Sequence, residues 1–311
     1  MQSRRVIVTG GAGFVGSHLA EELVNRVYHV TILDDLSTGK IENIEDLLKN
    51  DNVEFIQGSV TDLILLQKLF KGVQYVFHQA AIPSVPRSIE DPYTSHEVNM
   101  TGTLNVLLAA KAQAVRKVIY ASSSSVYGDT PTLPQREDMI LSPMSPYAVA
   151  KLAGEYYCQV FHYVYGLPTA CLRYFNVYGA RQDPNSQYAA VIPRFIRWVG
   201  SGESPVIFGD GEQTRDFTFV KDVAGANILV AESEACGVFN IGWGRSTSIN
   251  RLAELITELV GNKIKPIHQE PRPGDIRHSL ADISRAKAFG YEPGYSLEAG
   301  LARTLRWFNT R

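Results

Sequence analysis

The sequence predicts an α/β fold in which a doubly wound parallel sheet is followed by a smaller mixed α/β domain. Three observations indicate this class: short apolar runs alternate with helical stretches in the first half, a glycine cluster directly follows the first run, and turn residues become dense after residue 176. Strands that alternate with helices form βαβ crossovers, and such crossovers build parallel sheets with helices on both faces.

Six apolar, mostly β-branched runs in the first half are predicted as strands, because continuous apolar character suits burial on both faces of a sheet. These strands cover residues 5–9, 29–33, 53–56, 75–78, 117–120 and 169–173. The stretches between them are predicted as helices over residues 14–25, 62–70, 91–112 and 146–165. The alternation accounts for most of the first half of the chain.

The second half has shorter predicted strands, at residues 206–208 and 238–241, among helical segments. Two helix faces are marked by leucine-rich periodicity: Leu252, Leu255, Ile256 and Leu259, and then Leu297, Leu301, Leu305 and Phe308. We therefore expect a first domain of residues 1–175 and a second domain of residues 176–311. Because no low-complexity linker separates them, the two should pack closely and share some elements.

Composition narrows the class of protein. The 311 residues include 30 Lys+Arg and 32 Asp+Glu, so the net charge of -2 gives no electrostatic reason for a nucleic-acid or membrane partner. No apolar run approaches the roughly 18 residues of a membrane span, and the N-terminus has no room for a signal peptide. Three distant cysteines and seven scattered histidines predict neither disulfides nor a metal site, so a cytoplasmic protein is expected.

The glycine cluster has the form of a phosphate-binding turn. Gly10, Gly13 and Gly16 lie between the first strand and the first helix, where glycines permit a tight bend and a close backbone approach to a pyrophosphate. The N–H groups at the start of that helix would face the phosphates. Asp34 follows Gly16 by eighteen residues, at the end of the second strand. A carboxylate at this place binds the ribose hydroxyls of a dinucleotide and repels a 2′-phosphate. The pattern predicts NAD rather than NADP.

A second pattern indicates proton transfer. Tyr147 and Lys151 are four residues apart, so both side chains lie on one helix face, and the preceding Ser145 and Pro146 suit the N-cap and first helical positions. A nearby ammonium would favour the tyrosine phenolate. Ser123 belongs to a serine cluster at the carboxyl end of the fifth strand, the edge where doubly wound folds bind ligands.

The spacing G-x-x-G-x-x-G resembles the extended short-chain dehydrogenase/reductase family, whose members bind NAD on a Rossmann fold. Residues 34–39 resemble its ribose-binding segment, with Asp35 where Asn is usual, and residues 78–81 resemble the segment after its fourth strand. Ser59 stands where the family usually has Asp. The resemblance implies these cofactor-binding residues: Gly10, Gly13, Phe14, Val15, Gly16, Asp34, Asp35, Ser37, Thr38, Gly39, Ser59, Val60, Gln79, Ala80, Ala81, Asn99, Tyr147, Lys151 and Tyr174.

Within this family the chain resembles the UDP-hexose 4-epimerases over essentially its whole length. Dehydratases and decarboxylases usually carry a carboxylate just after the catalytic Ser or Thr, whereas this chain has Ser124 and Ser125. Residues 173–179, 178–193, 209–216 and 271–275 resemble the segments that bind the nucleotide sugar. The resemblance implies these substrate-binding residues: Ser84, Ser123, Ser125, Asn176, Ala190, Val191, Val206, Arg215, Arg272, Asp275 and Ser279.

The resemblance also implies a mechanism with Ser123, Tyr147 and Lys151 as catalytic residues. Tyr147 takes the proton from O4 while the C4 hydride passes to NAD, and the 4-keto sugar rotates before the hydride returns. Ser279 stands where glucose-restricted epimerases have a tyrosine, and its small side chain would leave room for an N-acetyl group. This favours UDP-GlcNAc and UDP-GalNAc as substrates, with UDP-Glc and UDP-Gal as further substrates. Two alternatives stay open: a UDP-glucuronate 4-epimerase, and a non-enzymatic sensor of NAD or nucleotide sugars. A homodimer through helices 91–112 and 146–165 is expected.

Overall fold

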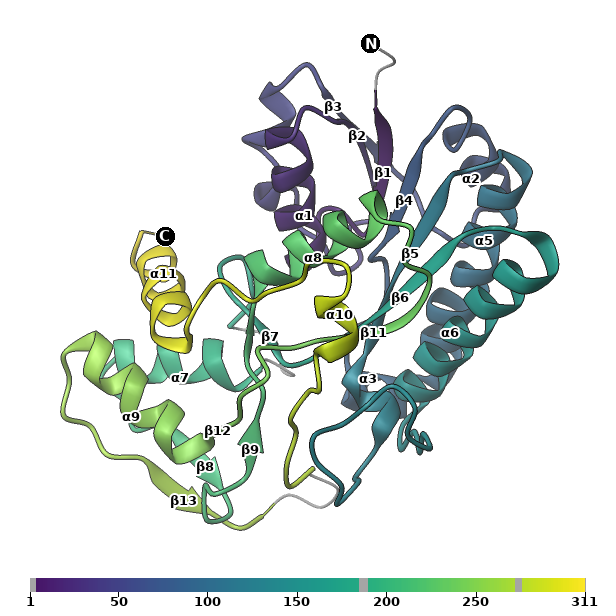
Figure 1. Ribbon diagram of the computed structural model, residues 1–311. Coiled ribbons are helices and arrows are strands. Elements are labelled where there is room, and N and C mark those ends of the chain that lie inside the picture. Colours follow the sequence, from purple (N-terminus) through teal and green to yellow (C-terminus); the bar gives the residue numbers. More distant parts are fainter. Residues whose placement is uncertain (1–3, 185–189, 272–275, 311) are drawn as a thin grey trace.

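The computed structural model describes residues 4–184, 190–271 and 276–310, and its centre is a seven-stranded sheet (Figure 1). All neighbouring strands are parallel, in the order β11-β6-β5-β4-β1-β2-β3. Because the order reverses between β1 and β4, the carboxyl ends of these strands open a crevice where ligands bind in such folds. The strands are β1 Arg5–Thr9, β2 His29–Asp34, β3 Val53–Gln57, β4 Tyr75–His78, β5 Lys117–Ser123, β6 Thr169–Tyr174 and β11 Gly237–Ile241.

The doubly wound α/β class is confirmed, since helices cover both faces of the sheet (Figure 1). One face packs against α1 (Phe14–Asn25) and α8 (Val220–Glu232). The other packs against α2 (Leu63–Leu69), α5 (Gly102–Ala112) and α6 (Pro146–Tyr165). Strand β1 shows the alternation: Val6 and Val8 belong to the first hydrophobic cluster and Ile7 to the second. Apolar residues on both faces therefore anchor the two layers.

The helix predicted over residues 91–112 is interrupted. It consists of α4 (Pro92–His96), a π-helical turn (Glu97–Thr101) and α5, and a short α3 (Val85–Glu90) precedes it. A π turn inserts one residue into the helical ladder and often occurs at functional sites. Here it contains Asn99, which the sequence placed at the cofactor. Three 3₁₀ turns, Ile41–Asn43, Leu47–Lys49 and Ser124–Tyr127, complete this half.

The remaining elements, except α10 (Ser284–Lys287), form a lobe at the carboxyl edge of the sheet, drawn at the lower left of Figure 1. Helix α10 packs against β11 of the large sheet. A third hydrophobic cluster fills the lobe, mainly between α7, α9 and α11. Leu252, Leu255 and Ile256 of the predicted apolar face are buried in it, whereas Leu259 is 41% exposed, so its assignment to the buried face was wrong. The elements of the lobe are α7 Val191–Gly200, α9 Ile249–Val260, α11 Leu297–Asn309, β7 Val177–Tyr178, β8 Val206–Phe208, β9 Thr214–Arg215, β10 Thr218–Phe219, β12 Thr247–Ser248 and β13 Ile267–Gln269.

The chain crosses between the two parts more than once. Strand β11 comes from the second half of the sequence but pairs with β6 in the large sheet, with Asn240 opposite Arg173. The domain boundary at residues 175 and 176 stays a prediction. Within residues 4–184, 190–271 and 276–310, no helix combines the length and apolar content of a membrane span, and no group of three His, Cys, Asp or Glu side chains converges as a metal site would require.

Candidate active site

The glycine turn is held so tightly that two of its positions exclude a side chain. Gly10 has φ +68°, and a Cβ there would lie 2.6 Å from the backbone N of Ala80, so the turn touches the loop after β4. A Cβ on Gly16 would collide with the carbonyl oxygen of Gly10. The N-cap of α1 is Gly13, which has no side chain to satisfy the first N–H groups of the helix. The helix end is thus shaped to receive an anion.

Asp34 lies beside this turn, at the carboxyl end of β2. Its Oδ2 accepts a hydrogen bond from Ala12 N at 2.9 Å and its Oδ1 accepts one from Leu36 N at 2.9 Å. Burial raises the pKa of Asp34, and these two backbone bonds lower it in part. A Cβ on Gly39 would lie 2.6 Å from Asp34 Oδ1, so the predicted ribose loop folds back over the carboxylate.

The loop after β4 forms the other wall of the crevice. Gln79 Nε2 donates to Asn227 Oδ1 at 3.1 Å, and the Tyr174 hydroxyl donates to Gln79 Oε1 at 3.1 Å. Asn227, on α8, is fully buried and also donates to the Tyr174 hydroxyl at 2.8 Å. Two predicted cofactor residues are therefore joined through a residue that the sequence reasoning missed.

Asn99 and Ser59 already have partners within the protein. Asn99 Oδ1 accepts from Ile82 N at 2.7 Å and its Nδ2 donates to Ile82 O at 3.2 Å, so Asn99 shapes the loop after β4. Ser59 Oγ accepts from Thr61 N at 3.2 Å and from Thr61 Oγ1 at 2.9 Å, which leaves its own hydroxyl proton to donate. Direct contacts of both with a cofactor stay predictions. The glycine cradle, the uncapped helix end and the buried carboxylate together fit NAD.

Tyr147, the predicted catalytic tyrosine, lies in the first turn of α6, as the sequence predicts. Ser145 caps the helix, since its Oγ accepts from Ala148 N at 3.1 Å, and Pro146 takes the first helical position. Tyr147 N donates to Ser88 Oγ of α3 at 3.1 Å. The Tyr147 side chain is hydrogen-bonded to Ser123: burial raises the pKa of Tyr147, and this hydrogen bond lowers it in part. The structure thus joins two of the three predicted catalytic residues.

Lys151 lies one helical turn further along and is only 3% exposed. Its Nζ donates to Ala121 O at 2.8 Å and lies 5.9 Å from the centre of the Tyr147 ring. Burial lowers the pKa of Lys151 to about 8. At neutral pH most of the population therefore still carries an ammonium, which favours ionisation of the neighbouring phenol.

His78 is a buried, uncharged histidine in the neighbourhood of Lys151. Thr103 Oγ1 donates to Asn99 O at 2.7 Å, so His78 Nε2 is the donor in its 3.0 Å contact with Thr103 Oγ1, and His78 Nδ1 accepts from Thr9 Oγ1 at 2.8 Å. Burial, with a smaller effect of the Lys151 charge, lowers the pKa of His78 to about 3. The lysine therefore faces no second positive charge on this side.

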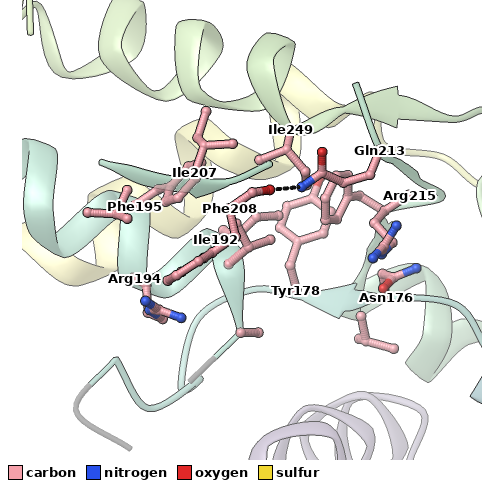
Figure 2. A pocket seen from close by; sticks show the side chains of 15 residues that line it. Asn176, Tyr178, Ile192, Arg194, Phe195, Ile207, Phe208, Gln213, Arg215 and Ile249 are labelled. Atoms are coloured by element: carbon pink, nitrogen blue, oxygen red, sulfur yellow. Dashed lines mark hydrogen bonds between the residues drawn. The ribbon is translucent and has the colours of Figure 1, made fainter. Parts of the chain in front are cut away.

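A cavity of about 290 Å³ lies in the lobe, and Asn176, just after β6, is among its lining residues (Figure 2). Figure 2 shows Arg215 and Asn176 together on one side of it and Arg194 on another. Gln213, which the sequence reasoning missed, donates from Nε2 to Phe208 O at 2.8 Å and keeps its buried Oε1 without a partner among the described residues. The predicted substrate residues that line the cavity are Asn176, Ala190, Val191, Val206 and Arg215.

Six predicted substrate residues are not among those that line this cavity: Ser123 lies beside Tyr147, two lie outside the described residues, and the other three are Ser84, Ser125 and Ser279. Ser84 caps α3, since its Oγ accepts from Arg87 N at 3.1 Å. Ser279 is 6% exposed, and its N donates to Thr214 O, beside Arg215. Arg272 and Asp275 lie outside the residues that the structure describes.

Ser125 is the remaining predicted substrate residue, and it lies directly beside the catalytic serine. Its N donates to Ser123 Oγ at 3.2 Å. Its own Oγ is buried with no partner among the described residues, so a contact of this hydroxyl with the substrate stays a prediction.

Two buried residues at the catalytic edge escaped the sequence reasoning. Ser88 binds the backbone of Tyr147 from 59 positions earlier, and no local pattern announces such a contact. Glu155 is fully buried and bonds to Arg173. Its signal was available, because it follows Tyr147 and Lys151 at the same four-residue helical spacing.

Known proteins share the fold and length of this chain. Residues 6–242 match the NAD dependent epimerase/dehydratase family. A putative UDP-glucose 4-epimerase of Methanocaldococcus jannaschii is 41% identical over 304 residues, 97% of each chain. A solved UDP-N-acetylglucosamine 4-epimerase of Methanobrevibacter ruminantium, in complex with UDP-N-acetylmuramic acid, has a TM-score of 0.96 at 46% identity, covering 100% of this chain and 99% of its own. A UDP-glucuronic acid 4-epimerase of Bacillus cereus, with UDP-glucuronic acid and NAD, has a TM-score of 0.91 at 34% identity, covering 98% and 99%.

Proposed function

The chain belongs to the NAD-dependent epimerase/dehydratase family, and on that premise we propose that it interconverts UDP-hexoses at C4 through a 4-keto intermediate. It is an isomerase that uses NAD as its cofactor. The observation that carries the proposal is the junction of Ser123, Tyr147 and Lys151 at the carboxyl edge of the sheet. Positions 124 and 125 hold serines, so the carboxylate that elimination or decarboxylation would need does not follow Ser123 in the chain.

The side chains divide the proton chemistry among them. Tyr147, as the phenolate, takes the proton from the sugar O4. Ser123 is hydrogen-bonded to Tyr147 and would also bind the sugar O4. The Lys151 ammonium stabilises the phenolate from the adjacent helical turn. NAD, which the glycine turn and Asp34 would hold, would supply reversible hydride transfer at C4. Tyr147 then returns its proton to O4.

The binding groups fit a substrate that is held by its nucleotide. Arg215, at the wall of the cavity, is placed to bind a diphosphate, because a guanidinium forms paired hydrogen bonds to phosphate oxygens. The apolar wall that includes Phe208 and Val206 suits the nucleoside. The sugar is expected to make few firm contacts, since it must rotate between the two hydride transfers.

UDP-GlcNAc and UDP-GalNAc are the preferred substrates in this proposal, with UDP-Glc and UDP-Gal also accepted. Ser279 N donates to Thr214 O, next to Arg215, and a small side chain at this position is the basis on which we expect an N-acetyl group to be accepted. The 46% identity to the UDP-N-acetylglucosamine 4-epimerase of M. ruminantium supports this choice. The likeness to the B. cereus enzyme keeps UDP-glucuronate as the second candidate.

The test incubates the purified protein with UDP-GlcNAc, UDP-Glc and UDP-glucuronate separately and measures the C4 epimers by NMR. The proposal expects UDP-GalNAc from the first substrate. Ser279→Tyr should abolish turnover of the acetylated pair and keep that of UDP-Glc, whereas Ser279→Ala, which is also small, should keep both. Turnover of UDP-glucuronate alone, or of the non-acetylated pair alone, would contradict the proposed substrate.

A homodimer through α6 and its neighbour α5 is part of the proposal. One side of α6 exposes apolar and aromatic side chains: Val149, Tyr156, Val160, Tyr163 and Val164. Such a contiguous exposed patch marks an interaction surface. Light scattering should give twice the chain mass, and Tyr156→Glu should give the mass of one chain. A cytoplasmic location is also proposed, and cell fractionation tests it.

A further inference from the structure

A buried ion pair lies behind the catalytic residues. Arg173, on β6, donates from Nε to Glu155 Oε1 at 2.8 Å and from Nη2 to Glu155 Oε2 at 2.7 Å. Both side chains are at most 3% exposed. Burying two charges costs desolvation that their attraction often fails to recover, so such a pair is weak evidence for a stabilising role. What the pair connects is more informative.

The carboxylate end of the pair connects the catalytic helix to the strand that carries Ser123. Glu155 lies one turn beyond Lys151 and two turns beyond Tyr147, on the same face of α6. Its Oε1 also accepts a hydrogen bond from Ser122 Oγ, and Lys151 Nζ donates to the carbonyl of Ala121. Two successive residues of β5 are therefore bound by two successive turns of α6, immediately before Ser123. These bonds fix the position of Tyr147 relative to Ser123.

The guanidinium end leads toward the lobe. Arg173 Nη1 donates to the Tyr127 hydroxyl at 2.8 Å, and that hydroxyl donates to Asn240 Oδ1 at 2.7 Å. Asn240 Nδ2 then donates to the carbonyl oxygens of Gln135 at 2.9 Å and Asp282 at 3.1 Å. Asp282 ends the segment of residues 279–282, which we call the sugar-side segment because it begins at Ser279. Every side chain from Glu155 to Asn240 in this chain of bonds is buried.

We propose that Glu155 and Arg173 are positioning residues, which hold α6 in register with β5 and join that register to the sugar-side segment. The proposal rests on the proposed 4-epimerase function. It separates two effects: bonds on the Glu155 side set the Tyr147–Ser123 geometry and so affect kcat, whereas bonds on the Tyr127 side set the sugar-side segment and so affect KM. A pair that only stabilised the fold would change neither selectively.

Ser122→Ala tests the first effect with little risk to folding, because Arg173 still binds Glu155. In the NAD-loaded enzyme, kcat for UDP-hexose should fall about ten-fold with KM within about two-fold of wild type, since small misplacements of catalytic groups cost large factors in rate. The pKa of Tyr147 should rise, because the hydrogen bond with Ser123 that lowers it is weakened. Alkaline difference absorbance against the same protein carrying Tyr147→Phe measures this pKa without any substrate.

Thr169→Val is the matched control, because Thr169 Oγ1 also joins β6 to α6, donating to Cys158 O at 2.9 Å, but away from the catalytic edge. It should leave kcat and the Tyr147 titration unchanged. Equal losses in the Ser122 and Thr169 variants, or a wild-type kcat and a wild-type Tyr147 pKa in Ser122→Ala, would overturn the proposal.

Tyr127→Phe tests the second effect by removing one oxygen from the chain of bonds. KM should rise about five-fold, the size of one lost hydrogen bond, with the Tyr147 titration unchanged. Tyr28→Phe removes the hydroxyl of an equally inaccessible tyrosine, which bonds to Glu232 at 2.6 Å outside this chain of bonds, and should leave KM unchanged. Equal KM values for the two variants would overturn the coupling. A wild-type protein that epimerises no UDP-hexose would refute the proposed function, and the Tyr147 titration of Ser122→Ala would still decide the positioning role.

Discussion

The catalytic edge and the nucleotide cavity are built in opposite ways. At the catalytic edge, Lys151, Ser122 and Arg173 are nearly inaccessible and hydrogen-bonded to neighbouring elements. At the cavity, Arg215 is only half-buried, and the walls come from the helix α7, short strands and loops. The contrast matches the two tasks of an epimerase. Proton and hydride transfer need fixed geometry, whereas the 4-keto sugar must be able to rotate between the two hydride transfers. Each experiment below perturbs one region and asks whether the other responds.

The largest effect is expected from Tyr147→Phe. Loss of the phenol removes the O4 acid and base, so kcat should fall about 10³-fold or more, while NAD content and KM change little. Stopped assays of purified protein and its bound-nucleotide content measure both. Tyr163→Phe keeps its aromatic ring on the proposed dimer surface of the same helix, away from Ser123, and should behave as wild type. A Tyr147 variant with wild-type turnover would refute the assigned role.

Lys151→Met should separate activity from stability. We expect kcat to fall about 10²-fold, because the charge that favours the phenolate is lost. The cofactor-free protein should gain on the order of 2 kcal/mol in unfolding free energy at pH 7. Lowering the pKa of Lys151 from 10.5 to about 8 costs about 3 kcal/mol, and loss of the hydrogen bond to Ala121 O offsets roughly 1 kcal/mol of this.

The sign of the Lys151 effect follows from the proton balance. Between pH 8 and about 10.5 the unfolded chain holds the lysine proton that the folded chain has lost, so wild-type stability rises with pH over that range. The advantage of the variant should therefore shrink toward pH 10.5, as urea unfolding at several pH values would show. An advantage independent of pH would show that the lowered pKa of Lys151 is not its cause.

Arg215→Ala should affect the cavity alone. Loss of a charge-assisted hydrogen bond to a diphosphate should raise KM about 10- to 100-fold with kcat within a few-fold of wild type. Steady-state kinetics with UDP-GlcNAc measure both constants. Arg251→Ala, on the outer side of α9 where it pairs with Glu254, is the control and should change neither. An equal fall in kcat would show that the two regions are not independent.

The smallest effect concerns His78 behind the catalytic edge. Its folded pKa of about 3 lies below the ordinary value of 6.5, so the unfolded chain takes up the proton first as the pH falls. Wild-type stability should drop by roughly 1–2 kcal/mol more than that of His78→Gln between pH 7 and pH 5. Urea unfolding at both pH values checks this, and His29→Gln, at an exposed histidine, should follow wild type. Identical pH dependence in all three would rule out a neutral buried His78.

The parallel sheet and the shared helix face of Tyr147 and Lys151 could be predicted from the sequence because both depend on local patterns. The strands are continuous apolar runs, and the two catalytic residues share one helix. The π turn that contains Asn99 could not be predicted, since one inserted residue leaves the helical periodicity almost unchanged. The exposure of Leu259 depends on where α9 ends, at Gly261 in the left-handed conformation.

Contacts between distant residues were beyond the sequence patterns. Ser88 reaches Tyr147 only because α3 packs against the start of α6. Arg173 stands in an apolar strand, where an isolated charge could have been recognised as needing a buried partner. Its partner Glu155 carried the four-residue spacing of the catalytic pair, so this was the one missed contact with a readable signal.

Strand β11 has a consequence for how the polypeptide is made. The outer edge of β6 is covered only by β11, so during synthesis that edge stays unpaired until the ribosome has added the whole stretch between residues 174 and 237. An unpaired edge of apolar strand is a template for aggregation. A fragment that stopped at residue 175 would keep that edge open permanently. Strand β11 therefore replaces β6 as the end strand of the sheet, and we expect the yield of soluble protein to depend on its synthesis.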